Sequence, residues 1–264
     1  MESGLRGKRC LITGGNTGIG FGIAKALATE GVELAVAGLT SAPEALKELQ
    51  NLTKNAFFLK VDVSEERAVV EMVYEALRFL GGVDLFVNNA AWAWHEPVTR
   101  ISSENFYRTV NTNLAACVWA CREVARHMIP RRSGSILIIG STVRFCPAYS
   151  EAAYRISKMG LKMYMETLAI ELAPYGIRVN MLTPGHHRTQ LTSGIPPQIE
   201  AKLIGEIPLR RFGDPSECGP AAAFLLSDRL ASYITGAEIV VDGGLALRPL
   251  PLRTDEEILK MNHP

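Results

Sequence analysis

The stretch TGGNTGIG, residues 13–20, decides the fold that we expect for this chain. An apolar run at 9–13 precedes it and predicts a buried strand, and an amphipathic run at 20–30 follows it and predicts a helix. Glycines at such a junction permit a tight turn and leave backbone N–H groups facing a phosphate at the helix N-terminus. Glycine clusters also arise for steric reasons alone, but the first strand-to-helix turn is the position that favours a dinucleotide site.

Beyond this turn, short apolar strands keep alternating with longer helices. We expect further strands at 33–37, 56–61, 84–88, 135–140, 177–182 and 238–241, and helices at 42–50, 65–79, 103–128, 152–173 and 215–226. This alternation implies right-handed crossovers and a parallel sheet that is covered on both faces. The sequence therefore predicts α/β architecture over residues 1–264, a single-domain doubly wound (Rossmann-like) parallel sheet of about seven strands with helices on both faces.

Two segments fall outside this pattern. Residues 189–208 contain two adjacent prolines and are expected to be irregular, with a short helix after them. We expect the region of about 186–210 to form a loop over the substrate. The region of about 248–264 combines prolines with charges and predicts an extended C-terminal tail.

The composition excludes several classes of function. The net charge is +1 and like charges form no run, whereas proteins that bind nucleic acid present a basic face. No apolar stretch approaches the roughly 20 residues that span a bilayer, and the N-terminus lacks the features of a signal peptide. The five cysteines are scattered, and Cys117 and Cys121 have no clustered partners that would hold a metal. We therefore expect a cytoplasmic protein with a small-molecule substrate, and no nucleic acid, membrane or metal partner.

The glycine turn resembles that of the short-chain dehydrogenase/reductase family, which is written T-G-x-x-x-G-x-G. The resemblance extends from Leu11 to about Gly244, and several short motifs agree in order and spacing. Asn88-Asn89-Ala90 matches the family's N-N-A-G except that Ala91 replaces the last glycine. The other matches are Asp62, Pro184-Gly185 followed by Thr189, Thr235-Gly236, and Val241-Asp242-Gly243-Gly244.

This resemblance implies a bound NAD(P). The residues expected to contact it are Gly14, Asn16, Thr17, Gly18, Ile19, Gly20, Gly38, Leu39, Thr40, Asp62, Val63, Asn89, Ala90, Tyr154, Lys158, Pro184, Gly185, His187 and Thr189. Asp62 would meet the adenine and Thr189 the nicotinamide amide. His187 occupies a position that is typically aliphatic in the family, and we expect its backbone to matter more than its ring.

Tyr154 and Lys158 form the candidate catalytic pair. They lie four residues apart on an expected helix, so their side chains share a face, and a nearby ammonium group should lower the pKa of a tyrosine. This spacing is common by chance. The resemblance adds Ser141, which would hold the substrate oxygen, and Asn113, which would hold a water that connects Lys158 to solvent. Together they predict an NAD(P)-dependent oxidoreductase that transfers a hydride between nicotinamide and a carbonyl or secondary alcohol.

Several alternatives remain open from the sequence. The chain could be a catalytically silent relative that binds the cofactor as a sensor or scaffold, although the tyrosine, lysine and serine are all retained. Among enzymes, it could be an NADPH-linked carbonyl reductase or an NAD-linked dehydrogenase of a sugar, polyol or steroid-like alcohol. Gly38 stands where NAD enzymes of the family carry an acidic residue, which favours NADP slightly, although Leu39 is not basic.

Six residues are candidates for substrate contact. They are Trp92, Trp94, Arg144, Phe145, Tyr149 and His186. The tryptophans would stack on a ring but serve equally well to pack a loop. Arg144 would bind an anionic group, but a surface or intersubunit ion pair is an equal alternative. The family is commonly homotetrameric, and we expect a homo-oligomer, either a tetramer or a dimer.

Overall fold

A seven-stranded parallel sheet forms the centre of the computed structural model, which describes residues 2–145, 147–190 and 192–247. The strand order is β3-β2-β1-β4-β5-β6-β7, and every neighbouring pair is parallel. The strands are β1 (Arg9–Thr13), β2 (Glu33–Gly38), β3 (Ala56–Lys60), β4 (Leu85–Asn88), β5 (Gly134–Ile139), β6 (Ile177–Pro184) and β7 (Glu238–Val241). The doubly wound α/β fold is confirmed, while the expected tail at 248–264 lies outside the described residues.

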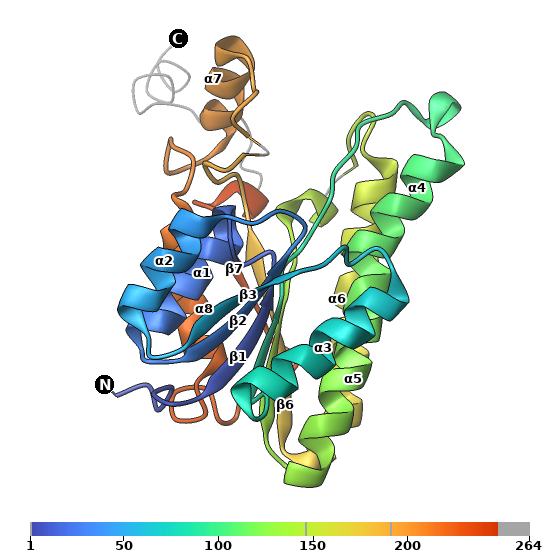
Figure 1. Ribbon diagram of the computed structural model, residues 1–264. Helices are drawn as coiled ribbons and strands as arrows, with labels where there is room; N and C mark the ends of the chain where they lie inside the picture. Colours follow the sequence, from blue (N-terminus) through green and yellow to red (C-terminus); the bar gives the residue numbers. More distant parts are fainter. Residues whose placement is uncertain (1, 146, 191, 248–264) are drawn as a thin grey trace.

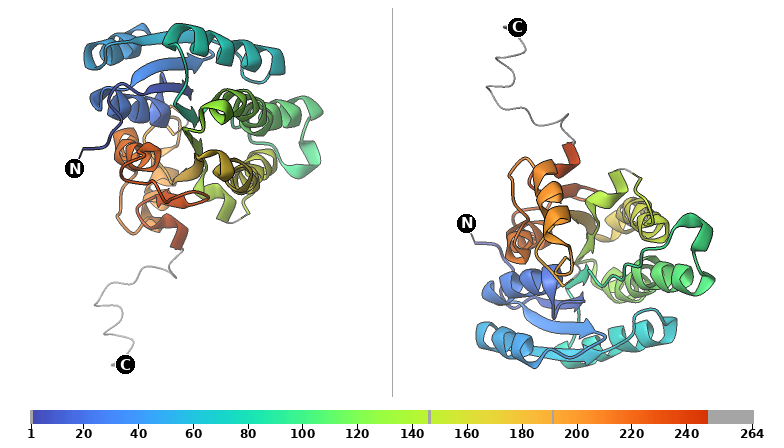
Figure 2. Two further views of the ribbon diagram at one scale, coloured as in Figure 1. Left: turned by 90° about the horizontal axis from the view of Figure 1, so that it is seen from below. Right: turned by 90° about the horizontal axis from the view of Figure 1, so that it is seen from above.

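Helices cover both faces of the sheet, as Figures 1 and 2 show. One layer contains α1 (Gly18–Thr29), α2 (Pro43–Leu52) and α8 (Cys218–Leu226). The other layer contains α3 (Glu66–Leu80), α4 (Ser103–Val110), α5 (Ala116–Arg131) and α6 (Ala152–Leu172). Helix α7 (Pro197–Glu206) stands apart, above the sheet in Figure 1.

Alternation along the strands sends successive side chains into two separate cores. On β1, Leu11 packs into the core beneath α3, α5 and α6, whereas Cys10 and Ile12 pack into the core beneath α1 and α8. Because both faces are covered, the inner strands are buried along nearly their whole length. This explains why their sequences are almost continuously apolar.

The strand order reverses between β1 and β4, and the site is built around this point. Ligands in open α/β sheets bind outside the carboxyl ends of the strands where the order reverses. Thr13 ends β1 and Asn88 ends β4, so the glycine turn and the Asn88-Asn89-Ala90 motif meet there. The fold thus brings together motifs that are about seventy residues apart in sequence.

Three expected boundaries are wrong. Helix α1 begins at Gly18, within the glycine turn, rather than after it. The helix expected at 103–128 is interrupted by a π-helical segment at Asn111–Ala115. Helix α7 forms inside the stretch 189–208, because Pro197 occupies the first helical turn, where a missing N–H group costs nothing.

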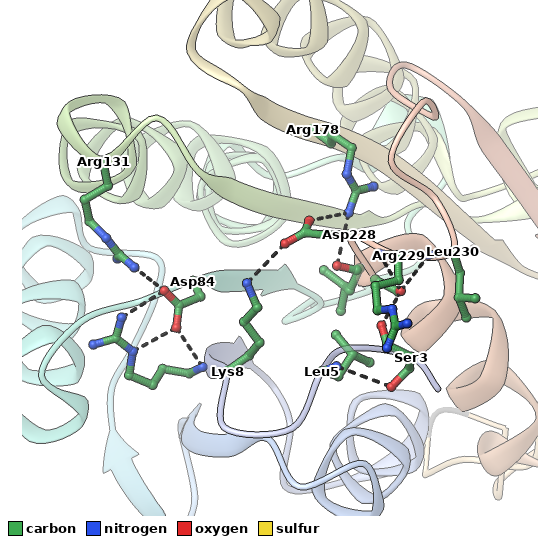
Figure 3. A network of polar contacts seen from close by, with 12 residues as sticks. Ser3, Leu5, Lys8, Asp84, Arg131, Arg178, Asp228, Arg229 and Leu230 are labelled. Carbon is green, nitrogen blue, oxygen red and sulfur yellow. Dashed lines mark hydrogen bonds and ion pairs between the residues drawn. The ribbon is translucent and has the colours of Figure 1, made fainter. Parts of the chain in front are cut away.

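Ion pairs close the amino end of the sheet (Figure 3). Asp84, just before β4, accepts hydrogen bonds from the backbone and guanidinium groups of Arg9 on β1 and from Arg131 at the end of α5. Arg178 on β6 donates to the carbonyl oxygens of Leu225 and Leu226 at the end of α8. These contacts join strands and helices that are distant in sequence.

Candidate active site

The glycine turn is shaped by close backbone contacts. Gly14 has a φ of +65°, and a Cβ atom there would lie 2.7 Å from Nδ2 of Asn89. A Cβ atom at Gly20 would lie only 2.1 Å from the carbonyl oxygen of Gly14. The Asn89 side chain donates to the carbonyl oxygens of Thr13 and Gly14 at 3.1 and 3.0 Å. The two motifs that were expected to share a cofactor therefore hold each other in place.

The N-terminus of α1 opens directly from this turn. Its N-cap residue, Thr17, makes no side-chain capping hydrogen bond, and no acidic residue lies in the first turn. Thr189 crosses this end of the helix, because its Cγ2 atom lies 3.3 Å from where a Cβ of Gly18 would be. An uncapped helix N-terminus without acidic neighbours suits an anionic phosphate, so these residues fit a dinucleotide.

Asn16 organises the end of β2. Its Nδ2 donates to the carbonyl oxygen of Thr40 at 2.7 Å, and its Oδ1 lies 2.6 Å from where a Cβ of Gly38 would be. The neutral carboxamide thus occupies the space beside Gly38, while Leu39 and Thr40 are exposed. No side chain of this group carries a negative charge.

The remaining residues of the expected cofactor site line the same end of the sheet. Asp62 is exposed after β3, and one of its oxygens accepts from the backbone and hydroxyl of Ser64. Val63 is buried and Ile19 packs against the core beneath α1. The backbone N–H of Ala90 donates to the Thr13 hydroxyl at 3.1 Å.

Tyr154 and Ser141 lie together at the carboxyl end of β5. Burial raises the pKa of Tyr154 above its ordinary value, and the hydrogen bond with Ser141 opposes that rise. The tyrosine is therefore protonated at neutral pH, ready to donate a proton. A serine hydroxyl beside a phenol can hold one substrate oxygen between them.

Lys158 lies one turn further along α6, on the same side of the helix. Its Nζ donates to the carbonyl oxygen of Ile139 on β5 at 3.1 Å and lies 5.7 Å from the centre of the Tyr154 ring. Burial lowers the pKa of Lys158 to about 8. The pKa of Tyr154 is thus raised rather than lowered as expected, because burial is the largest effect and the Lys158 ammonium contacts the Ile139 carbonyl oxygen.

Asn113 lies in the π-helical segment and is fully buried. Its Oδ1 accepts from the backbone N–H of Trp92 at 2.7 Å, and its Nδ2 donates to the Trp92 carbonyl and the Ser157 hydroxyl, both at 3.0 Å. Ser157 donates in turn to the carbonyl oxygen of Tyr154 at 2.6 Å. Asn113 thus connects the loop after β4 to the helix that carries Tyr154 and Lys158. The water that it was expected to hold stays a prediction.

Sequence reasoning missed Ser157. It lies between the tyrosine and the lysine, and nothing in its spacing distinguishes it from an ordinary helix residue. The structure points to Ser157 through its contact with Asn113 in the π-helical segment, since such segments are frequent at functional sites.

The loop after β6 is held at several points. Gly185, which follows Pro184, donates from its N–H group to the carbonyl oxygen of Val241 at 2.9 Å. His186 is half-buried and stacks on Phe212, with ring centres 5.4 Å apart. His187 is buried and its ring contacts Cys218 on α8. The ring is thus packed and makes polar contacts of its own, while the expectation that the backbone of His187 matters more than its ring stays a prediction.

The two tryptophans that are candidates for substrate contact pack on each other. The rings of Trp92 and Trp94 stack with centres 5.6 Å apart, and the guanidinium of Arg108 lies over Trp92 at 4.9 Å. Trp92 is therefore occupied on a ring face and through its backbone, whereas half of Trp94 is exposed. Trp94 is the better placed of the two to meet a ligand.

Arg144 forms an ion pair within the chain. Its guanidinium contacts Glu238 on β7, and both side chains are nearly buried. Glu238 also accepts from the hydroxyl of Thr183. The substrate role considered for Arg144 is not supported, because its charge is already balanced by Glu238, a partner that sequence spacing does not reveal. Phe145 and Tyr149, by contrast, are exposed.

Two classes of site are absent from the part of the chain that the structure describes. Within residues 2–145, 147–190 and 192–247, no three His, Cys, Asp or Glu side chains gather as metal ligands. No helix in these same ranges has the length and apolar character needed to cross a bilayer.

Comparisons with known proteins agree with this geometry. A family model described as enoyl-(acyl carrier protein) reductase matches residues 14–246. A 3-oxoacyl-[acyl-carrier-protein] reductase of Chlamydia pneumoniae is 35% identical, over 93% of this chain and 99% of its own length. A 3beta-hydroxysteroid dehydrogenase of Eggerthella lenta is 34% identical, over 94% and 97%. The solved structure of a provisionally assigned short-chain alcohol dehydrogenase from Sinorhizobium meliloti 1021 superposes with a TM-score of 0.90 at 33% identity, covering 94% of this chain and all of that one.

Proposed function

This chain belongs to the short-chain dehydrogenase/reductase family of oxidoreductases that act on alcohol and carbonyl groups, and on that premise we propose that it is an NAD(P)-dependent carbonyl reductase. Tyr154 transfers the proton. The observation that carries the proposal is the placement of Tyr154 against Ser141, at the carboxyl end of the sheet and beside the buried Lys158. The reverse oxidation of a secondary alcohol uses the same residues.

The protonation state of Tyr154 is the one that reduction needs. Reduction requires a tyrosine that carries its proton, and burial raises the pKa of Tyr154. When bound, the reduced nicotinamide supplies a hydride to the carbonyl carbon. Ser141 donates to the carbonyl oxygen and orients it, and Tyr154 gives that oxygen its proton. Lys158, which holds a proton near neutral pH, then stabilises the phenolate that Tyr154 becomes.

Replacing Tyr154 by phenylalanine tests this assignment. The change removes the proton donor but keeps the ring, so kcat should fall by about a hundredfold to ten-thousandfold while dinucleotide affinity stays within about twofold. Carbonyl reduction on a substrate panel and dinucleotide fluorescence measure the two quantities. The panel should include 3-oxoacyl thioesters and oxosteroids, because relatives carry the names of such enzymes.

Tyr164 on the same helix provides a matched control. Its hydroxyl donates to the Val118 carbonyl at 3.4 Å, far from Ser141 in sequence and contacts. Tyr164→Phe should leave turnover nearly unchanged. Near-normal turnover in Tyr154→Phe would refute the role of Tyr154. A wild-type protein that binds the dinucleotide but turns over nothing in the panel would favour the rival hypothesis, a sensor or scaffold.

We propose NADP as the preferred dinucleotide. Gly38 and Asn16 present no carboxylate at the end of β2, so nothing there repels a 2′-phosphate. Thr40 and Ser41 are exposed and can donate hydrogen bonds, and the exposed Lys60 is in register with Gly38. Fluorescence titration should give tighter binding of NADPH than of NADH. Lys60→Gln should weaken the binding of NADPH and leave the binding of NADH unchanged. An equal loss of affinity for both dinucleotides would contradict this preference.

We also propose that the protein is a cytoplasmic homo-oligomer that assembles through α6. Its outer face is apolar and unpartnered within the described chain, with Ile156, Met159, Met163 and Ile170 all more than half exposed. A contiguous apolar stripe on a helix marks an interaction surface. Sedimentation of wild type and Met163→Glu should give an oligomer and a smaller species, and a monomeric wild type would refute the proposal.

The four cysteines that the structure describes are free and buried, which suits a reducing compartment.

A further inference from the structure

The ring of His187 is the polar contact between the loop after β6 and helix α8. It is 3% exposed, and its two nitrogens face different partners. Nδ1 lies 3.2 Å from the carbonyl oxygen of Gly185, and Nε2 lies 3.4 Å from Sγ of Cys218, the first residue of α8. The resemblance to known relatives gave this position no such role, because an aliphatic residue is usual there.

The two contacts define the hydrogen-bond direction. A carbonyl oxygen only accepts, so Nδ1 carries the ring proton, and the neutral ring then accepts at Nε2. Cys218 must therefore donate its S–H. Burial raises the pKa of Cys218 to about 12, so the thiol keeps its proton at neutral pH. The thiol is thus available as the donor in this contact.

The surrounding backbone leaves room for this ring and no more. A Cβ atom at Gly213 would lie 2.6 Å from the His187 ring, so glycine is required opposite it. The backbone of Gly213 also bonds the loop on both sides, accepting from Arg188 and donating to His186, each at 2.9 Å. The ring is therefore clamped between the loop and the segment that leads into α8.

Helix α8 in turn is fixed against the helix that opens from the glycine turn. A Cβ atom at Gly22 of α1 would lie 2.2 Å from the carbonyl oxygen of Pro215, and one at Gly219 of α8 would lie 2.6 Å from Cβ of Ala26. The start of α8, next to Cys218, is thus packed closely against α1. Beyond His187, the loop reaches Thr189, which lies over Gly18.

We propose that His187, through Cys218, is a positioning residue that sets the height of the 185–189 loop above the glycine turn and so places the nicotinamide end of the dinucleotide. This inference rests on the proposed function, since it assumes that a dinucleotide binds here. The adenosine end would lie at β2 and β3, whereas the polar contacts of the His187 ring are with Gly185 and Cys218. Loss of the contact should therefore weaken interactions with the nicotinamide half and spare the rest.

Binding of whole and truncated dinucleotides tests the proposal. The probes are NADPH with 2′-phospho-ADP-ribose, and NADH with ADP-ribose, where the second of each pair lacks nicotinamide. His187→Asn keeps a donor near Gly185 but removes Nε2, and Cys218→Ala removes the thiol. Each should weaken the whole dinucleotide about fivefold and change the truncated one less than about twofold. The double variant should be no weaker than the worse single variant.

Controls separate positioning from damage. Cys218→Ser keeps a hydroxyl donor and should recover part of the lost affinity. Cys10→Ala removes an equally buried thiol from the same core and should leave the affinity for whole and truncated dinucleotides unchanged. If either His187→Asn or Cys218→Ala fails to fold, as judged by circular dichroism, the other variant still reports on the contact.

Three outcomes overturn the proposal. Equal weakening of whole and truncated dinucleotides would mean that the contact merely supports the fold. Unchanged binding of both would mean that the contact does not position the loop. Failure of the wild type to bind any of the four probes would refute the proposed function itself, and this inference with it.

Discussion

The two ends of the sheet use polar residues in opposite ways. At the amino end, Asp84 is surrounded by guanidinium groups, and Lys8 and Arg178 both contact Asp228 (Figure 3). At the carboxyl end, Ser141 contacts Tyr154, and Lys158 donates to a backbone carbonyl oxygen. The same strands therefore present balanced charges at one end and hydrogen-bonding groups at the other.

Two serines near the opposite ends of β5 differ in their surroundings. Ser135 near the amino end of β5 is 1% exposed, and its hydroxyl has no hydrogen-bond partner among the described residues. Ser141, just beyond the carboxyl end, bonds the candidate proton donor. Ser135 is therefore an unpaired hydroxyl inside the core and an exception to the pairing at the amino end, whereas Ser141 is engaged at the candidate site.

Ser141→Ala is the sharpest test of this contrast. It removes a donor to the substrate oxygen, and we expect kcat to fall by about a hundredfold or more, equivalent to about 3 kcal/mol of transition-state stabilisation. Urea unfolding should change by less than about 0.5 kcal/mol.

Ser135→Ala is the matched control, and it should leave kcat unchanged. Because it removes a buried hydroxyl without a partner, it should be neutral or slightly stabilising. A large loss of activity in Ser135→Ala would break the division between the two ends.

Asp84→Asn tests the other end. Burial alone would raise the pKa of Asp84, but the hydrogen bonds from Arg9 and Arg131 hold it well below its usual range. We expect a loss of about 2 kcal/mol in the free energy of unfolding, measured in urea, with dinucleotide affinity unchanged.

The contribution of Asp84 to the free energy of unfolding should also depend on pH in a defined direction. Because the pKa of Asp84 is lowered in the folded state, its contribution is complete above the ordinary carboxyl pKa and is lost as the pH falls below it. The variant should show a shallower acid limb than the wild type. Asp228, which is half exposed, is the control, and Asp228→Asn should cost less than about 1 kcal/mol.

Lys158→Met should change the way in which stability depends on pH. The pKa of Lys158 is lowered to about 8, so above that pH the unfolded chain binds more protons than the folded one. Wild-type stability should therefore rise by about 1 kcal/mol between about pH 8 and pH 9, and this rise should vanish in Lys158→Met. Urea unfolding at several pH values measures it, and an identical rise in both proteins would contradict the assignment.

The sequence predicted the strands and the layers well because period and burial are local properties. Strands buried on both faces must be apolar, as β5 and β6 are, and helices between them must have one apolar face. The prediction of one continuous helix at 103–128 was wrong at Asn111–Ala115, where the structure has a π-helical segment. Such a segment differs from an α-helix in having i→i+5 backbone hydrogen bonds, and the spacing of apolar residues does not reveal that difference.

The candidate site divides in the same way. The sequence by itself determined the parallel α/β fold, the glycine turn and the spacing of Tyr154 and Lys158, since each depends on residues that are near in sequence. Only the tertiary structure decided that Glu238 neutralises Arg144, that Lys158 points at Ile139, and that Cys218 meets His187. Those contacts join side chains from separate elements, and their directions depend on packing and burial, which no local pattern encodes.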